Sequence, residues 1–277
     1  MGSLLSAVAS FLQARVNHGQ WLLRIEDIDP PREVPGSALN IVHDLQIFGM
    51  VSDEPILYQS QRIAVYKESL ETLLQQGKAF RCKCSRKSLA EFTVYPGYCR
   101  QLKTSGTAVR LKVDKHKITV TDRLQTRKSY KLNQEVGDYI IWRGDDLPAY
   151  QLAVVVDDNF QQITEVVRGC DLMDSTPRQI YLQQKLGINT PQYLHIPVIT
   201  DRNGRKLSKS YAADPINKLT PPAAIKLCLE LLGHPPPADI VELGQLWSWA
   251  ISNWRLENIP THSTKLMLPH SIYPIPR

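Results

Sequence analysis

The sequence of 277 residues predicts an α/β fold built on a parallel sheet, and two observations carry this prediction. First, segments with apolar residues at helical spacing alternate with short apolar runs, the order typical of parallel strands joined by helices. Second, the stretch 21–33 begins as an apolar run and ends in acids, two prolines and an arginine. Because proline cannot donate to a sheet ladder, this strand must stop by Pro30. Its charged end therefore falls at the carboxyl edge of the sheet, where open α/β sheets bind ligands.

Two charged side chains within this stretch, Arg24 and Glu26, need partners. Burying either one unpaired would cost several kcal/mol. A ligand site and a structural ion-pair network explain the pattern equally well, because both place charges in a cleft.

The composition is that of a globular protein, with 43% hydrophobic and 22% charged residues. The net charge of +6 permits a polyanionic partner such as RNA without demanding one. No apolar run is long enough to cross a membrane, and no basic segment precedes Leu4, so we expect a cytoplasmic protein without a secretory signal. Five cysteines, three of them clustered, favour a reducing compartment and a metal site over a disulfide framework.

Three helices are predicted in the first third of the chain, at 3–18, 37–49 and 61–76. In the third helix Tyr66 faces inward and is expected to belong to the core rather than to a ligand site. The apolar face expected to pack inward in the second helix comprises Leu39, Ile41, Val42, Leu45 and Phe48.

Cys82, Cys84 and Cys99 follow the third helix, and thiolates at this spacing can converge on one tetrahedral Zn²⁺. Neither a histidine nor an acid stands beside Cys99 to supply a fourth ligand. Free thiols are the alternative. Residues 107–133 then alternate apolar and polar residues and predict short antiparallel strands. Their basic residues would form either a phosphate-binding face or a solvated surface: Arg110, Lys112, Lys115, Arg123, Arg127, Lys128 and Lys131.

The second half continues with strands at 138–143, 163–172 and 193–199. Thr176 and Gln179 form a capping box with a proline in the first turn, which predicts a helix that ends near Leu186. A basic loop at 203–210 follows the last strand. It is followed by helices at 221–232 and 240–249 and by a loosely ordered tail at 260–277. We expect the following side chains near the last helix to be packed in a core: Leu246, Trp247, Ala250, Ile251 and Trp254.

Four motifs resemble those of one enzyme family. They are "RIEDIDPPRE" at 24–33, "YQLAVVVDD" at 150–158, "ITEVVRGCDL" at 163–172 and "KLSKS" at 206–210. Together they resemble the glutamyl-tRNA synthetases, which are class I aminoacyl-tRNA synthetases, and in particular their shortened paralogues, the glutamyl-queuosine tRNA(Asp) synthetases. The resemblance extends from Gly2 to about Leu256.

The resemblance implies a Rossmann-like catalytic domain with a small zinc-bearing insertion and a short C-terminal helical segment. By position, Glu26, Tyr150 and Arg168 would bind glutamate. The alternatives are that Tyr150 packs in the core and that Arg168 pairs with Asp171 or with an acid near Glu26. Lys209 and Lys206 would act on ATP, and the ATP site would also include Ser208 and Gly2. Mg²⁺ would accompany ATP, with Asp27 and Asp29 as candidate contacts. The implied zinc ligands are Cys82, Cys84, Tyr95 and Cys99.

Four regions follow from this comparison. The first half of the catalytic domain would span 1–78, the insertion 79–133, the second half 134–212, and a helical stem-contact-like segment with the tail 213–277. The implied activity is ATP-dependent activation of L-glutamate and its transfer to queuosine at the wobble position of tRNA(Asp), by a monomer that binds the anticodon stem-loop. The alternatives are a catalytic fragment of a glutamyl-tRNA synthetase and a non-catalytic, zinc-stabilised RNA-binding remnant.

The start of the sequence differs from the family pattern. In the family a strand and a turn precede the first helix and carry an arginine, serines and a histidine for glutamate and ATP. Met1 and Gly2 stand where that motif ends. We therefore expect the chain as printed to be impaired, and residues added upstream to restore activity.

Overall fold

The computed structural model describes residues 1–29, 33–102, 104–200, 219–261 and 265–267. Its helices are α1 (Gly2–Val16), α2 (Ser37–Ile47), α3 (Ile63–Gln75), α4 (Leu132–Glu135), α5 (Tyr150–Phe160), α6 (Thr176–Leu186), α7 (Pro221–Leu231) and α8 (Leu243–Asn253). Its strands are β1 (Arg24–Ile25), β2 (Leu57–Tyr58), β3 (Ala79–Cys82), β4 (Ala108–Leu111), β5 (Lys117–Val120), β6 (Lys128–Lys131), β7 (Tyr139–Trp142), β8 (Glu165–Gly169), β9 (Gln192–Ile196), β10 (Val198–Thr200) and β11 (Lys265–Met267).

The predicted parallel strands are present as short pairs. β1 pairs with β2, β8 with β9, and β10 with β11, all in parallel. The antiparallel strands predicted at 107–133 are confirmed: β5 pairs with β6, and β4 lies between β3 and β7 in a three-stranded sheet. Within the described residues no ladder joins β1 to β8, so the parallel strands form separate pieces.

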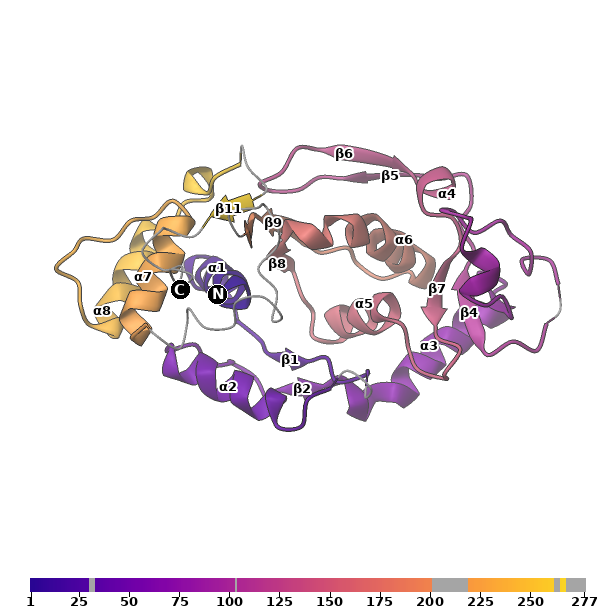
Figure 1. Cartoon of the computed structure of the whole chain (residues 1–277), viewed down its shortest axis with the longest axis horizontal. Helices are drawn as coiled ribbons and strands as arrows, with labels where there is room; N and C mark the ends of the chain where they lie inside the picture. Colours follow the sequence, from indigo (N-terminus) through magenta and orange to yellow (C-terminus); the bar gives the residue numbers. More distant parts are fainter. Residues whose placement is uncertain (30–32, 103, 201–218, 262–264, 268–277) are drawn as a thin grey trace, which may run out of the picture.

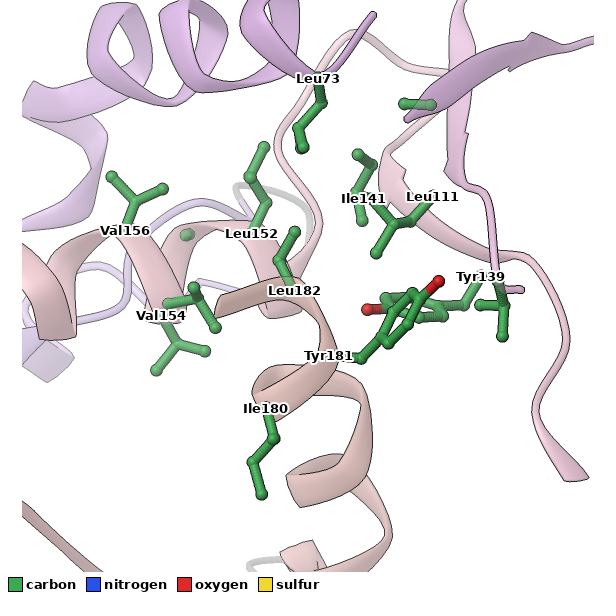
Figure 2. Close-up of a cluster of buried hydrophobic side chains, with 14 of the residues drawn as sticks. Leu73, Leu111, Tyr139, Ile141, Leu152, Val154, Val156, Ile180, Tyr181 and Leu182 are labelled. Carbon is green, nitrogen blue, oxygen red and sulfur yellow. The ribbon is translucent and has the colours of Figure 1, made fainter. Parts of the chain in front are cut away.

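Two hydrophobic clusters hold these elements together. One lies where α1 meets α7 and α8, which Figure 1 shows side by side at one end of the molecule. The other joins α3, α5 and α6 to the β3–β4–β7 sheet (Figure 2). Helix α5 is its centre, because every residue from Leu152 to Val156 is buried. Tyr66 is fully buried and donates from its hydroxyl to Asp157 at 2.6 Å, which confirms its structural role.

The second predicted helix is correct in place but wrong in burial. No residue of α2 is buried, and Leu39 and Ile41 are 70% and 45% exposed. Phe48, just beyond the helix, is buried and Leu45 is partly buried against the same core. The apolar face of α2 is therefore only partly buried, because the helix lies beside a cleft that Ala38 and Ile41 line.

Several predicted boundaries also shift. The strand predicted at 193–199 divides at Pro197 into β9 and β10, since proline has no N–H for the ladder. The strand predicted at 163–172 ends at Gly169 and passes into a 3₁₀ turn, Cys170–Ser175. Helix α8 begins at Leu243 rather than at 240 because Glu242 is extended. The tail is not entirely loose: Lys265–Met267 form β11 against β10.

The helix predicted at 176–186 is confirmed in its bounds, with proline in its first turn and Gly187 left-handed at its end (φ 72°). Its capping box is wrong. Ser175 occupies the N-cap without a side-chain bond, and the Thr176 hydroxyl is used in a buried network described below. No helix in the described part of the chain is long and apolar enough to span a bilayer.

Candidate active site

A cleft of about 1000 Å³ opens where three elements meet: the start of α1, the end of β1 and the end of β8. Three of the predicted substrate-binding residues line it, Gly2, Glu26 and Arg168. The two candidate Mg²⁺ contacts, Asp27 and Asp29, line it as well. The structure thus brings together residues that are up to 166 positions apart in the sequence, at the carboxyl ends of parallel strands as the sequence predicts.

The amino end of α1 faces this cleft through Gly2, Ser3 and Ser6. A Cβ added at Gly2 would meet no atom within 4 Å, so the backbone there is open to a ligand. The first turn carries no acid. Unpaired N–H groups and the positive end of the helix dipole suit a phosphate at this point.

Arg24 and Glu26 form part of a charge network in which Arg24 and Asp158 are largely buried and the Glu26 side chain is 41% exposed. Arg24 Nη1 lies 2.9 Å from Asp158 Oδ1, and its Nη2 lies 3.7 Å from Glu26 Oε1. Burial raises the pKa of Glu26, and the positive charge of Arg24 lowers it only in part. The ion-pair reading is therefore confirmed, and the ligand-site reading stays a prediction, with Glu26 lining the cleft.

Arg168 is 9% exposed, and its guanidinium donates hydrogen bonds to two buried side chains. Its Nε donates to His195 Nε2 at 3.2 Å, and its Nη2 donates to Thr176 Oγ1 at 2.9 Å. Sequence reasoning missed both partners. Thr176 resembled a helix cap, and His195 stood in an apolar strand pattern with no signal of its contact.

Tyr150 occupies the first position of α5 and is partly buried. Burial raises the pKa of its hydroxyl, the negative charge of Glu26 raises it further, and the positive charge of Arg168 lowers it. Tyr150 is not among the residues that line the cleft, so its contact with glutamate stays a prediction.

The two aspartates of the first motif have protein partners. Asp27 accepts from the backbone N–H and the hydroxyl of Ser60, at 2.8 and 2.6 Å. Asp29 lies 3.1 Å from Arg143 Nη1. Their contact with Mg²⁺ stays a prediction. Lys206, Ser208 and Lys209 fall outside the described residues.

A separate cluster joins the three cysteines to Tyr95. The Sγ atoms of Cys82, Cys84 and Cys99 lie within 4.8 Å of one another. Cys84 Sγ lies 3.6 Å from Cys99 Sγ, and the Tyr95 hydroxyl lies 3.6 Å from the sulfurs of Cys82 and Cys84. Sulfur ligands of a tetrahedral Zn²⁺ with bonds of about 2.3 Å lie about 3.8 Å apart, so the spacing fits zinc.

The thiols of the cluster differ in their tendency to ionise, because burial raises the pKa of Cys84 whereas the pKa of Cys99 is lowered. Burial raises the pKa of Cys99, but the backbone N–H of Lys83 and the hydroxyl of Tyr95 outweigh it and lower the pKa to about 7. Arg110 donates from Nε to Cys82 Sγ at 3.4 Å and lies over the Tyr95 ring. These contacts would hold the sulfurs and the phenol in place for a metal.

A second hollow, of about 590 Å³, lies between β1 and β8. Leu22 and Arg24 line one wall, and the segment 165–167 lines the other. Each of these strands has one ladder partner within the described chain, β2 for β1 and β9 for β8. Residues of α1, such as Gln13 and Ala14, line the hollow as well.

Comparison with known proteins agrees with this geometry. The family model of the class I tRNA synthetases (E and Q), catalytic domain, matches residues 1–93 and 99–217. The glutamyl-Q tRNA(Asp) synthetase of Pseudomonas paraeruginosa is 44% identical over 268 residues, which cover 95% of this chain and 92% of the relative. The enzyme of the same name from Pseudomonas fluorescens is 46% identical and covers 94% of this chain and 89% of the relative.

Solved structures show the same fold. A glutamate tRNA ligase from Elizabethkingia meningosepticum, in complex with its amino acid, superimposes with a TM-score of 0.80 at 23% identity. The match covers 98% of this chain, which spans 64% of the length of that ligase. On the family model and on the curated relatives, the chain belongs to the class I synthetases for glutamate and glutamine and, among them, to the glutamyl-Q tRNA(Asp) synthetase family.

Proposed function

We propose that this chain activates L-glutamate with ATP and transfers it to queuosine at the wobble position of tRNA(Asp). One observation carries the proposal: Glu26, Arg168 and the amino end of α1 line one cleft. An amino acid presents an ammonium and carboxylates, and a nucleotide presents phosphates. This cleft offers a carboxylate, a guanidinium and a helix N-terminus to match them.

The first step joins glutamate to the nucleotide. The α-carboxylate of glutamate attacks the α-phosphorus of ATP, the bond to the bridging oxygen breaks, and pyrophosphate leaves. Arg168 binds a substrate carboxylate through its guanidinium, and Glu26 receives the ammonium. The backbone N–H groups of Gly2 and Ser3 donate hydrogen bonds to phosphate oxygens, and Mg²⁺ would accompany the nucleotide. Lys206, Ser208 and Lys209 complete the ATP site in this proposal, although they fall outside the described residues.

The second step moves the glutamyl group to the nucleoside. A hydroxyl of the cyclopentene diol of queuosine attacks the activated carbonyl, and AMP leaves. We assign no protein nucleophile, because such a site works by positioning its reactants and stabilising charge.

The choice of tRNA(Asp) rests on the relatives. Curated proteins named glutamyl-Q tRNA(Asp) synthetase are 44–46% identical to this chain, against 23% for the glutamate tRNA ligase structure. Basic side chains on and beside the β5–β6 hairpin support an RNA partner, since Lys115, Arg127, Lys128 and Lys131 are exposed. In this proposal the protein acts as a monomer that binds the anticodon stem-loop.

Zinc belongs to the proposal as a structural ion. Cys82, Cys84, Tyr95 and Cys99 would hold it, and such a closed four-ligand site has no open position for catalysis. When bound, the ion would fix the segment between β3 and β4.

The test is ATP-dependent transfer of labelled glutamate to tRNA(Asp) prepared with and without queuosine. Labelling that requires queuosine supports the proposal. Labelling of queuosine-free tRNA(Glu) at its 3′ end would instead indicate a glutamyl-tRNA synthetase fragment. RNA binding without glutamate-dependent pyrophosphate exchange would indicate a non-catalytic remnant.

A further inference from the structure

A buried network of hydrogen bonds connects Arg168 to Asp122, which lies between β5 and β6. Asp122 follows β5, and its Oδ2 lies 2.6 Å from His195 Nδ1. On the other side of the ring, His195 Nε2 meets Arg168 Nε at 3.2 Å and Thr176 Oγ1 at 3.1 Å. The side chains of His195 and Asp122 are 0% and 2% exposed, so water does not compete for these bonds.

The direction of each bond follows from the donors. A guanidinium Nε always carries a hydrogen, so His195 Nε2 must accept from Arg168. The ring proton then resides on Nδ1 and is donated to Asp122. Burial raises the pKa of Asp122, but the bonds from His195 and from the backbone of Gln125 and Leu124 outweigh it and leave the pKa lowered. The hydrogen bonds therefore run in one direction, with Arg168 donating to His195 and His195 donating to Asp122.

We infer that Asp122 and His195 are positioning residues for substrate binding: they hold one edge of the Arg168 guanidinium so that its end meets a glutamate carboxylate in the cleft. This inference rests on the proposed function. His195 and Thr176 occupy Nε and Nη2. With that edge held, a carboxylate approaches the guanidinium end-on, across Nη1 and Nη2. A guanidinium bound at one edge loses less freedom when it meets its ligand.

The environment of Asp122 makes a selective test possible. Its Oδ1 accepts three backbone N–H groups, from Leu124 at 3.0 Å, Gln125 at 2.8 Å and His195 at 3.2 Å. In Asp122→Asn the amide oxygen must keep that place, so the NH₂ group faces His195 Nδ1. The ring then carries its proton on Nε2, where it opposes the Arg168 N–H. An asparagine in place of an aspartate beside a histidine inverts a tautomer in the same way in serine proteases.

The first readout is kinetic. In glutamate-dependent ATP–pyrophosphate exchange, Asp122→Asn should raise the KM for glutamate about tenfold, the effect of one buried hydrogen bond. The KM for ATP and kcat should stay close to their original values. The longer side chain of His195→Gln can bring its carbonyl to the position of Nε2 and still accept from Arg168. This variant should therefore retain more glutamate affinity than His195→Asn, whose carbonyl does not reach as far. His234→Asn is the matched control, because His234 is also buried but hydrogen-bonds to Leu232 and Arg255 instead.

The second readout does not need the substrate. ¹⁵N NMR of the folded chain should show His195 protonated on Nδ1 and a slowly exchanging Arg168 Nε–H. In Asp122→Asn the His195 proton should move to Nε2, and the Arg168 Nε–H should no longer exchange slowly. A ring protonated on Nε2 in the original chain would overturn the inference, as would an inverted tautomer with an unchanged glutamate KM. If no glutamate-dependent exchange occurs in the original chain, the proposed function fails, and the Arg168 signal still decides whether the dyad holds the guanidinium.

Discussion

Arg24 Nη1 and Asp158 Oδ1 lie 2.9 Å apart and join β1 to α5 in a buried ion pair. Their side chains are 15% and 10% exposed. The pair borders both the cleft and the hollow between β1 and β8, because Arg24 lines each of them. Glu26 also contacts this guanidinium, so the pair contributes to the charge of the cleft.

Removing one partner should destabilise the fold. In Arg24→Met, Asp158 and Glu26 lose their cation, and the free energy of unfolding should fall by about 3 kcal/mol. Urea denaturation measures the change. The matched control is Arg15→Met, which breaks the more exposed pair with Asp53 and should cost about 1 kcal/mol or less. Equal losses in the two variants would show that the Arg24 pair is not a buried, structural one.

The cysteine cluster should bind one zinc ion per chain. Metal analysis of the purified protein should find zinc, and Cys99→Ser should lose it together with thermal stability, because a structural site adds its binding free energy to folding. Tyr95→Phe should bind zinc more weakly than the original chain. Cys170→Ser, outside the cluster, is the control and should keep its zinc. A chain that folds with equal stability in a strong chelator would contradict the zinc assignment.

His234 should make stability depend on pH near neutrality. Burial lowers the pKa of His234 below its ordinary value of 6.5, and this effect exceeds the opposing bonds to Leu232 and Arg255. The unfolded chain therefore binds the proton more readily. The contribution of the neutral ring is fully present above pH 6.5 and is lost as pH falls toward the folded-state pKa.

Urea denaturation between pH 7.5 and 5.5 tests this dependence. His234→Asn removes the titrating group, so stability should fall less with decreasing pH in the variant than in the original chain. Carboxyls with raised pKa values, such as those of Glu26 and Asp158, are common to both chains, and their effects cancel in the difference. Parallel stability curves would contradict the role of His234.

The sequence predicted the elements that depend on local pattern. Helix α6 is an example, since Pro177 and Gly187 mark its ends through their own backbone preferences. The convergence of Glu26 with Arg168 on one cleft agrees with the family resemblance, which assigned both residues to glutamate binding. The cysteine cluster was predicted from spacing together with the family resemblance.

Features that depend on tertiary partners were not predictable. The apolar stripe of α2 indicated burial, but Leu39 is exposed because burial needs a covering element as well as a pattern. The hydroxyl of Thr176 was assigned to a helix cap and instead joins Arg168 and His195. Nothing in the local sequence indicates that Asp122 lies beside His195, since 73 positions separate them.

The measurement that tests the central claim most directly uses two isolated RNA hairpins. One is the anticodon stem-loop of tRNA(Asp) with queuosine at the wobble position, and the other is the acceptor stem of tRNA(Glu) with its 3′ end. With labelled glutamate and ATP, the account predicts that label enters the queuosine hairpin, that it does not enter the same hairpin with guanosine, and that the acceptor stem stays unlabelled. Labelling of the acceptor stem, or of the guanosine hairpin, would contradict it.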